Sequence, residues 1–168
     1  DNERRVAVVS LDLIALLADD VARIRLALAA AGELPPEQIM IACSHTHRAP
    51  FTSDGNATDD GSILAVDAGA GSAYLALVSA RLEAAMTDAA TNPRPAEFLV
   101  GRAQAPGWAF NRRPIYTGGE VGTHGWAWQE DFVRMEGTPD EDIWILAARG
   151  RDGGIIGGLT GFACHPTA

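Results

Sequence analysis

Five apolar runs of strand length and two amphipathic stretches of helix length divide the chain. The strand-length runs are nearly continuous in apolar side chains, which is typical of strands buried on both faces. They cover residues 5–13, 39–47, 96–104, 142–148 and 155–163. The helical stretches repeat apolar residues at intervals of three and four, which predicts one buried stripe on each helix. Those stripes are Leu17, Val21, Ile24 and Leu28, and Leu75, Val78, Leu82 and Met86.

The order of these elements predicts an α/β fold. A strand, a helix and a second strand occupy the first fifty residues, and this order is typical of a crossover between neighbouring parallel strands. The runs 142–148 and 155–163 are joined by a Gly-rich turn, which predicts a hairpin. We therefore expect a layered domain in which helices flank a mixed β-sheet. In such folds the active site lies at the carboxyl ends of the strands.

Gly, Pro and Ser mark the predicted ends of the helices and the loops. The first helix should stop at Gly32, and Ser72 should cap the second helix. Residues 51–71 are rich in Gly, Asp, Ser and Ala, which predicts a loop. Residues 105–141 show no sustained period, and a loop of that length in a compact domain is usually functional or disordered.

The most informative stretch is the end of the run 39–47. Side chains two apart share one face of a strand, so Cys43, His45 and His47 should face one cavity. The run 155–163 also leads directly into a histidine, His165. The chain has only four histidines, and two strands that end in this way predict a metal site. The fourth, His124, lies in the long loop, and we expect no role for it there.

Several other residues have more than one interpretation. Arg112 and Arg113 could stabilise an oxyanion or form surface salt bridges. Cys43 and Cys164 could be disulfide partners, metal ligands or buried thiols, and we favour buried thiols. The carboxylates of the first loop could bind a cation, but solvated surface positions are the more common outcome. These carboxylates belong to Asp54, Asp59, Asp60 and Asp67.

Length and charge narrow the class of protein. A chain of 168 residues and 17.7 kDa with 47% hydrophobic residues can bury one core, so we expect residues 1–168 to form a single domain. We expect this domain to be an incomplete part of a larger one, because the chain has no initiator Met and stops three residues after His165. The net charge of -9, with no cluster of Lys and Arg, argues against a nucleic-acid partner. No apolar stretch is long enough to predict a transmembrane segment.

Three ordered motifs resemble a known family. Ser-His-Thr-His-x-x-Pro begins at Ser44, Asn-Arg-x-Pro begins at Asn111, and Phe-Ala-x-His-x-Thr begins at Phe162. Together they resemble the amino-terminal catalytic domain of the neutral/alkaline, non-lysosomal ceramidases and their bacterial relatives. The resemblance covers nearly the whole chain. It differs in Arg48 to Thr52 and in the last three residues, where the family usually has Ser-Gly-Pro-Gly-Gly and Gly-Thr-Ser.

The resemblance implies a zinc enzyme that cleaves the N-acyl bond of ceramide. By this resemblance His45 and His165 are zinc ligands, His47 holds the activated water or the substrate, and Arg112 contacts the substrate near the scissile amide. The family's remaining ligands, a glutamate and a tyrosine, come from later sequence. We therefore expect residues 1–168 alone to bind zinc weakly. Both departures lie around the implied metal site. They concern the identity of the substrate and leave the expected hydrolase activity unchanged.

The chemistry of these residue types agrees with this hypothesis. Neutral imidazoles bind zinc well, and zinc activates water at neutral pH. A nearby guanidinium stabilises the oxyanion that forms on an amide carbonyl. The sequence therefore predicts a zinc-dependent amidohydrolase acting on a small-molecule or lipid amide. Two alternatives stay open: a non-catalytic relative that binds a ligand or partner, and a cysteine amidase, which apolar surroundings of the thiols disfavour.

Overall fold

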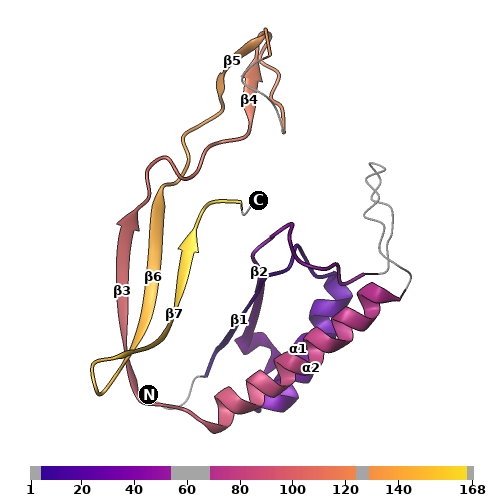
Figure 1. The fold of residues 1–168 in the computed structure, drawn as a ribbon, viewed down its shortest axis with the longest axis vertical. Helices are drawn as coiled ribbons and strands as arrows, with labels where there is room; N and C mark the ends of the chain where they lie inside the picture. The colour runs from indigo at the N-terminus through magenta and orange to yellow at the C-terminus, as the bar shows by residue number, and fades with distance from the viewer. Residues whose placement is uncertain (1–4, 54–68, 124–128, 166–168) are drawn as a thin grey trace. The chain divides into compact units, whose positions relative to one another are not determined.

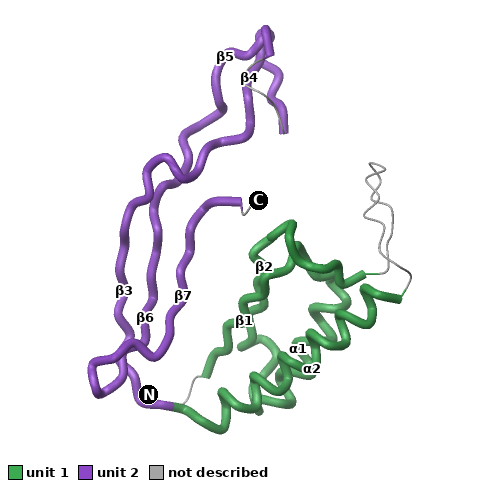
Figure 2. The backbone as a smooth tube through the Cα atoms, viewed as in Figure 1, with its two compact units in different colours: residues 1–93, 166–168 green, residues 94–165 purple. Residues whose placement is uncertain are grey.

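A computed structural model describes residues 5–53, 69–123 and 129–165 (Figure 1). The chain forms two compact units. Unit 1 contains the described residues up to Pro93, and unit 2 runs from Arg94 to His165 (Figure 2). Five residues discussed above lie outside the described residues, namely Asp54, Asp59, Asp60, Asp67 and His124.

Unit 1 contains a two-stranded parallel sheet and two helices. Strand β1 spans Ala7–Leu11 and pairs in parallel with β2, which spans Ile39–Cys43. Helix α1, Ala18–Gly32, and the short 3-10 turn η1, Pro36–Gln38, connect the two strands. Helix α2 spans Ala70–Thr91. The predicted order of strand, helix and parallel strand is confirmed.

The core of unit 1 lies between one face of this sheet and both helices. Its buried residues come from α1, from β2 and from α2, and four of them belong to the predicted helical stripes. The core consists of Ile24, Leu28, Ile39, Leu75 and Met86. The strands alternate in burial, so that Val8 and Met40 on the opposite face of the sheet are 45% and 58% exposed. The apolar stripes of the sequence thus bury α1 against β2 and α2 against α1.

Helix α1 ends at Gly32, as the sequence predicts, whereas helix α2 begins differently from the prediction. Helix α2 begins at Ala70 with Gly69 as its N-cap, so Ser72 lies in the first turn and is not the cap. Helix α1 includes Gly32, and the left-handed position after it is taken by Glu33, whose backbone N–H donates to the Ala29 carbonyl. An αL cap can therefore be supplied by a residue other than glycine when this hydrogen bond closes the helix.

Unit 2 is built around a three-stranded antiparallel sheet. Strand β3, Ala96–Gln104, pairs with β6, Asp142–Gly150, and β6 pairs with β7, Ile155–Phe162. The predicted third strand and the predicted hairpin are confirmed. Trp144 on β6 packs under the guanidinium of Arg102 on β3, with 5.3 Å between the guanidinium carbon and the ring centroid.

The prediction that residues 105–141 form one long loop is wrong. Within this range β4, Pro114–Tyr116, and β5, Phe132–Met135, form an antiparallel pair. The register shifts between Ile115 and Tyr116. Strands this short, interrupted by an irregularity, leave no period-two pattern long enough to detect in the sequence.

The predicted α/β class is confirmed, since helices occur with parallel and with antiparallel strands. The parallel pairing belongs to unit 1 and the antiparallel pairings belong to unit 2, in separate sheets of the described residues. Within the described ranges, neither helix has the length and apolar character that crossing a bilayer requires.

Candidate metal centre

The backbone turns sharply at the end of β2. Ser44 and His45 continue the association with the chain that follows β1, because their N–H groups donate to the carbonyls of Leu11 and Leu13 at 2.9 and 3.0 Å. His45 has a φ of 62°, which is the left-handed region that a residue with a Cβ seldom adopts. The prediction of one extended strand through His47 is therefore wrong, because the alternation of faces stops at this turn.

The imidazole of His45 is oriented by the loop between β1 and α1. Its Nδ1 lies 2.7 Å from the carbonyl oxygen of Ile14. A carbonyl can only accept, so Nδ1 carries the proton and donates it. In the neutral ring the lone pair then belongs to Nε2. A metal-binding histidine typically donates its other N–H in this way, which sets the tautomer and the direction of the ring.

His47 lies close to His45, although not by the strand geometry that the sequence predicts. The two ring centroids are 5.2 Å apart and the ring planes meet at 86°, in an edge-to-face arrangement. Both side chains are exposed. The left-handed backbone at His45 turns the chain, and this turn rather than strand alternation brings the two imidazoles together.

Ser44, to which the sequence assigns no role at the metal site, adds a polar atom beside His45. Its hydroxyl oxygen is buried and has no hydrogen-bond partner among the described residues. A buried polar atom of this kind calls for an explanation such as an ordered water, an ion or a catalytic role. Its position next to His45 is the only signal for it in the sequence, because a serine after a strand is otherwise common.

Both cysteines are free thiols, which excludes the disulfide interpretation for this structure. Burial raises the pKa of the Cys43 thiol above its ordinary value, and a hydrogen bond with the Leu16 backbone opposes this effect only in part. Cys43 therefore stays protonated at neutral pH. The prediction of two buried thiols is wrong for Cys164, which is exposed and follows the end of β7.

His165 follows β7 in unit 2 and is half-buried. Beside it, the Cys164 N–H donates to the Phe162 carbonyl at 2.8 Å, and the Cys164 thiol lies 3.6 Å from the carbonyl oxygen of Trp108. The segment after β3 thus runs next to the end of β7 within this unit. Sequence patterns could not have predicted this contact, because the two segments are separated by β4, β5 and β6.

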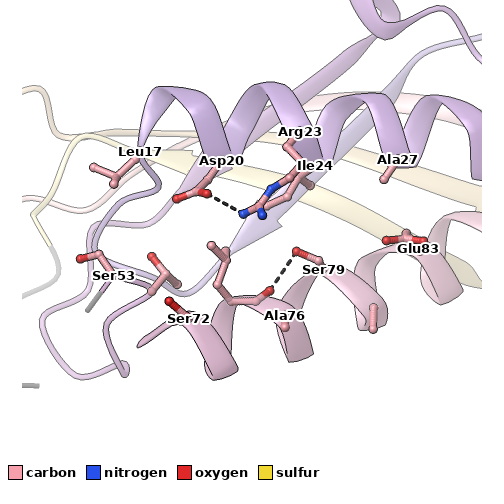
Figure 3. A pocket seen from close by; sticks show the side chains of 13 residues that line it. Leu17, Asp20, Arg23, Ile24, Ala27, Ser53, Ser72, Ala76, Ser79 and Glu83 are labelled. Atoms are coloured by element: carbon pink, nitrogen blue, oxygen red, sulfur yellow. Dashed lines mark hydrogen bonds and ion pairs between the residues drawn. The ribbon is translucent and has the colours of Figure 1, made fainter. Parts of the chain in front are cut away.

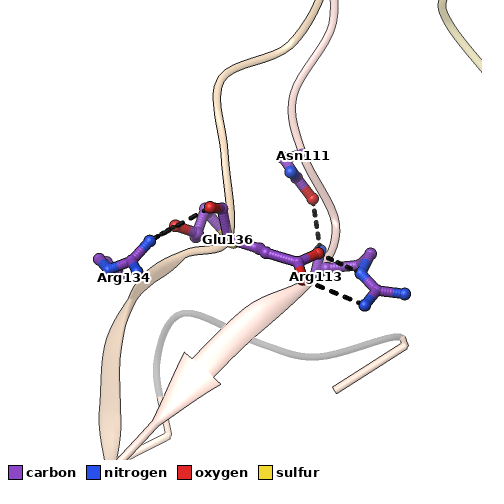
Figure 4. Close-up of polar contacts among 5 residues, drawn as sticks. Asn111, Arg113, Arg134 and Glu136 are labelled. Carbon is purple, nitrogen blue, oxygen red and sulfur yellow. Dashed lines mark hydrogen bonds and ion pairs between the residues drawn. The ribbon is translucent and has the colours of Figure 1, made fainter. Parts of the chain in front are cut away.

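The two neighbouring arginines of the predicted oxyanion site have different surroundings, and Figure 4 shows those of Arg113. Arg113 forms an ion pair with Glu136 that includes an Nη2–Oε1 contact of 3.2 Å, and its N–H donates to Asn111 Oδ1 at 2.9 Å. The guanidinium of Arg113 lowers the pKa of Glu136, chiefly through the side-chain hydrogen bond between these two residues. Arg112 is exposed and forms no ion pair with the described residues. The salt-bridge interpretation therefore holds for Arg113, and Arg112 is the residue of the pair that can contact a ligand.

A groove of about 700 Å³ lies elsewhere in unit 1, between α1 and α2 (Figure 3). None of the candidate histidines lines it. Along its walls, Arg23 pairs with Asp20 at 2.6 Å within α1, and Ser79 donates to the Leu75 carbonyl at 2.9 Å within α2, so both polar groups are satisfied within their own helices. Gly71 allows the start of α2 to approach Ser53, because a Cβ there would lie 2.2 Å from the Ser53 carbonyl oxygen. The groove is thus a packing feature of the helix pair.

Comparisons with protein-family models, with curated proteins and with solved structures gave no match to this chain.

Proposed function

We propose that this protein is a zinc-dependent hydrolase of N-acyl amides, with His45 and His165 as metal ligands. The observation that carries the proposal is the orientation of the His45 ring. A left-handed backbone and the Nδ1–H bond to the Ile14 carbonyl hold this ring with Nε2 as its ligand atom. Strained backbone of this kind is concentrated at functional sites.

The donor set fits zinc. Neutral imidazole nitrogens are among the preferred ligands of zinc, and catalytic sites combine three protein ligands with one position for water or substrate. The buried, unsatisfied hydroxyl of Ser44 beside His45 is consistent with a further group at this position. His45 and His165 are the two proposed ligands that this chain supplies. The ligands that the ceramidase resemblance implies beyond these two are a glutamate and a tyrosine.

In the proposed reaction the residues of the chain have separate roles. A bound zinc ion would polarise the amide carbonyl and make a water molecule more acidic. His47, whose ring lies 5.2 Å from that of His45, would take a proton from the attacking water and return it to the leaving amine. The guanidinium of Arg112 would stabilise the negative charge that develops on the carbonyl oxygen.

The raised pKa of Cys43 favours this proposal over a cysteine amidase. A nucleophilic cysteine requires a thiolate, and burial acts against the thiolate at Cys43. Cys164 is exposed, and its thiol donates to the Trp108 carbonyl at 3.6 Å.

Parallel inhibition and metal titration test the proposal. Zinc is titrated into the metal-free chain by calorimetry, and hydrolysis of a fluorescent N-acyl sphingosine analogue is followed with a chelator or with iodoacetamide. We expect residues 1–168 to bind zinc weakly, because two of the implied ligands come from later sequence, and to hydrolyse the analogue poorly at most. Any hydrolysis should be lost with the chelator, return with zinc and survive alkylation of both thiols. Hydrolysis that resists the chelator and is lost on alkylation would assign the activity to a cysteine instead.

A further inference from the structure

The segment that follows β3 begins with a tight, fixed turn. Trp108 donates its N–H to the Ala105 carbonyl at 3.4 Å, across Pro106 and Gly107. Gly107 has a φ of 79°, which matches the third position of a type II turn, where a side chain would be strained. Pro106 supplies the φ that the second position requires. The residue types at positions 106 and 107 therefore favour this turn by themselves.

Two further hydrogen bonds hold this turn against the residue that precedes β6. The Ala105 N–H donates to the Glu141 carbonyl at 2.9 Å, and the Gly107 N–H donates to the Glu141 carboxylate at 3.0 Å. A turn with three backbone hydrogen bonds keeps its shape. The direction in which it carries the next residues is therefore set by the fold of unit 2.

The residues that this turn presents to solvent are aromatic. Trp108 is 79% exposed and Phe110 is 83% exposed, and these are the largest exposed fractions among the large hydrophobic side chains of the described residues. Isolated exposed apolar side chains are common on proteins, but two aromatic residues two positions apart on a fixed turn form a small apolar projection. We call residues 105–112 the aromatic turn.

The charges around the aromatic turn suit a phosphate-bearing surface. Residues 105–113 contain two arginines and no acidic residue. The charge of Arg113 is offset by Glu136, whereas Arg112 forms no ion pair with the described residues. The nearby carboxylate of Glu141 is engaged by the Gly107 N–H. The aromatic turn therefore combines two apolar rings with one accessible guanidinium.

We propose that the aromatic turn docks on the interfacial region of a phospholipid bilayer. Trp108 and Phe110 enter the boundary between headgroups and acyl chains, and Arg112 contacts the lipid phosphates. Aromatic rings with a neighbouring Arg are typical of proteins that lie on this boundary without crossing it. The inference goes beyond the proposed hydrolase and does not need a metal. Because the Trp108 carbonyl accepts the Cys164 thiol, docking would bring the end of β7, including His165, to the lipid surface.

Sedimentation with vesicles tests this inference on the metal-free 168-residue chain. We expect binding to phosphatidylcholine vesicles that persists at high salt, because apolar contact provides most of the attraction. The double variant Trp108→Ala/Phe110→Ala should lower the partition coefficient about thirtyfold, as partial burial of two aromatic side chains predicts. With equal parts of phosphatidylglycerol, binding should weaken, because the chain carries a net charge of -9.

A matched control removes apolar surface of similar exposure from unit 1. Leu26 and Leu77 are 63% and 53% exposed on the two helices, and Leu26→Ala/Leu77→Ala should bind vesicles as the unsubstituted chain does. Circular dichroism checks that both double variants fold. Equal vesicle binding by the aromatic-turn variant overturns the inference. The inference is also overturned if the unsubstituted chain does not bind vesicles and instead self-associates in sedimentation velocity, and if the Trp108→Ala/Phe110→Ala variant loses this self-association. The aromatic turn would then be a contact between copies of the chain.

Discussion

Strands β2 and β7 both lead into a histidine, but the two histidines are held by different means. In unit 1, His45 has a left-handed backbone, and both its N–H and its ring donate to the loop after β1. In unit 2, His165 is not among the described residues with positive φ, and its neighbour Cys164 is tied to Trp108. The first histidine is oriented through its own backbone and ring, and the second lies where a neighbouring residue is held.

This difference shows how a fold can provide two candidate ligands at unequal cost. A left-handed non-glycine residue costs on the order of 1 to 2 kcal/mol, and the hydrogen bonds to Leu13 and Ile14 offset that cost. The orientation of His45 is therefore prepared before any ligand binds. Such preparation lowers the entropy that ordering the ring would cost on metal binding.

The largest expected effect is on zinc affinity, and it should be similar for the two histidines. His45→Ala and His165→Ala should each lower the affinity for zinc by more than about a hundredfold, because each removes a proposed ligand. Calorimetric zinc titration of each variant measures this, with His124→Ala as the control that keeps the affinity of the unsubstituted chain. Unchanged zinc affinity in either variant would remove that histidine from the proposed site.

Nitrogen-15 spectra of the imidazoles supply a check that does not depend on affinity. In the metal-free chain the His45 signals should show the proton on Nδ1, as the 2.7 Å contact with Ile14 requires. A proton on Nε2 would contradict the orientation from which the ligand atom is inferred.

An effect of intermediate size is expected on stability, because backbone strain is present at His45 and not at His165. At position 45 the glycine variant should be more stable than the alanine variant by about 1 kcal/mol, because glycine adopts positive φ without a steric cost. At position 165 the glycine variant should be no more stable than the alanine variant. Chemical denaturation of His45→Gly, His45→Ala, His165→Gly and His165→Ala gives both differences. Equal differences at the two positions would mean that strain does not distinguish them.

The smallest effect concerns Arg113 and its pH dependence. The Arg113–Glu136 hydrogen bond lowers the pKa of Glu136, so its stabilisation is present above the ordinary carboxyl pKa and is lost as the pH falls through the lowered value. Arg113→Gln should therefore lower the melting temperature slightly at neutral pH, and the difference should vanish in acid. The pair is exposed, so the effect is small.

Arg112→Gln is the matched control for this measurement. It removes the same charge one residue away, from a guanidinium with no ion pair among the described residues, so the melting temperature should not change at either pH. Its effect should appear in turnover instead, as a fall of about a hundredfold if Arg112 stabilises the oxyanion. A loss of stability without a loss of turnover would make Arg112 structural.

The sequence by itself determined the elements with long, regular patterns. The buried residues Ile24, Leu28, Leu75 and Met86 followed from helical periodicity, and the parallel pairing followed from the order of strand, helix and strand. Over the length of a whole helix, burial of a continuous apolar stripe outweighs local conformational preferences. Each of these elements can therefore be predicted from its own sequence. The short strands β4 and β5 lacked that length and were missed.

The tertiary structure decided how the candidate residues are oriented. The left-handed turn at His45 depends on the carbonyls of Leu13 and Ile14, and the choice between Arg112 and Arg113 depends on Glu136. These are contacts with residues about twenty to thirty positions away, and backbone carbonyls have no residue type that a pattern could detect. Residue types therefore predicted which chemistry was available, whereas contacts between distant segments selected the atoms that can perform it.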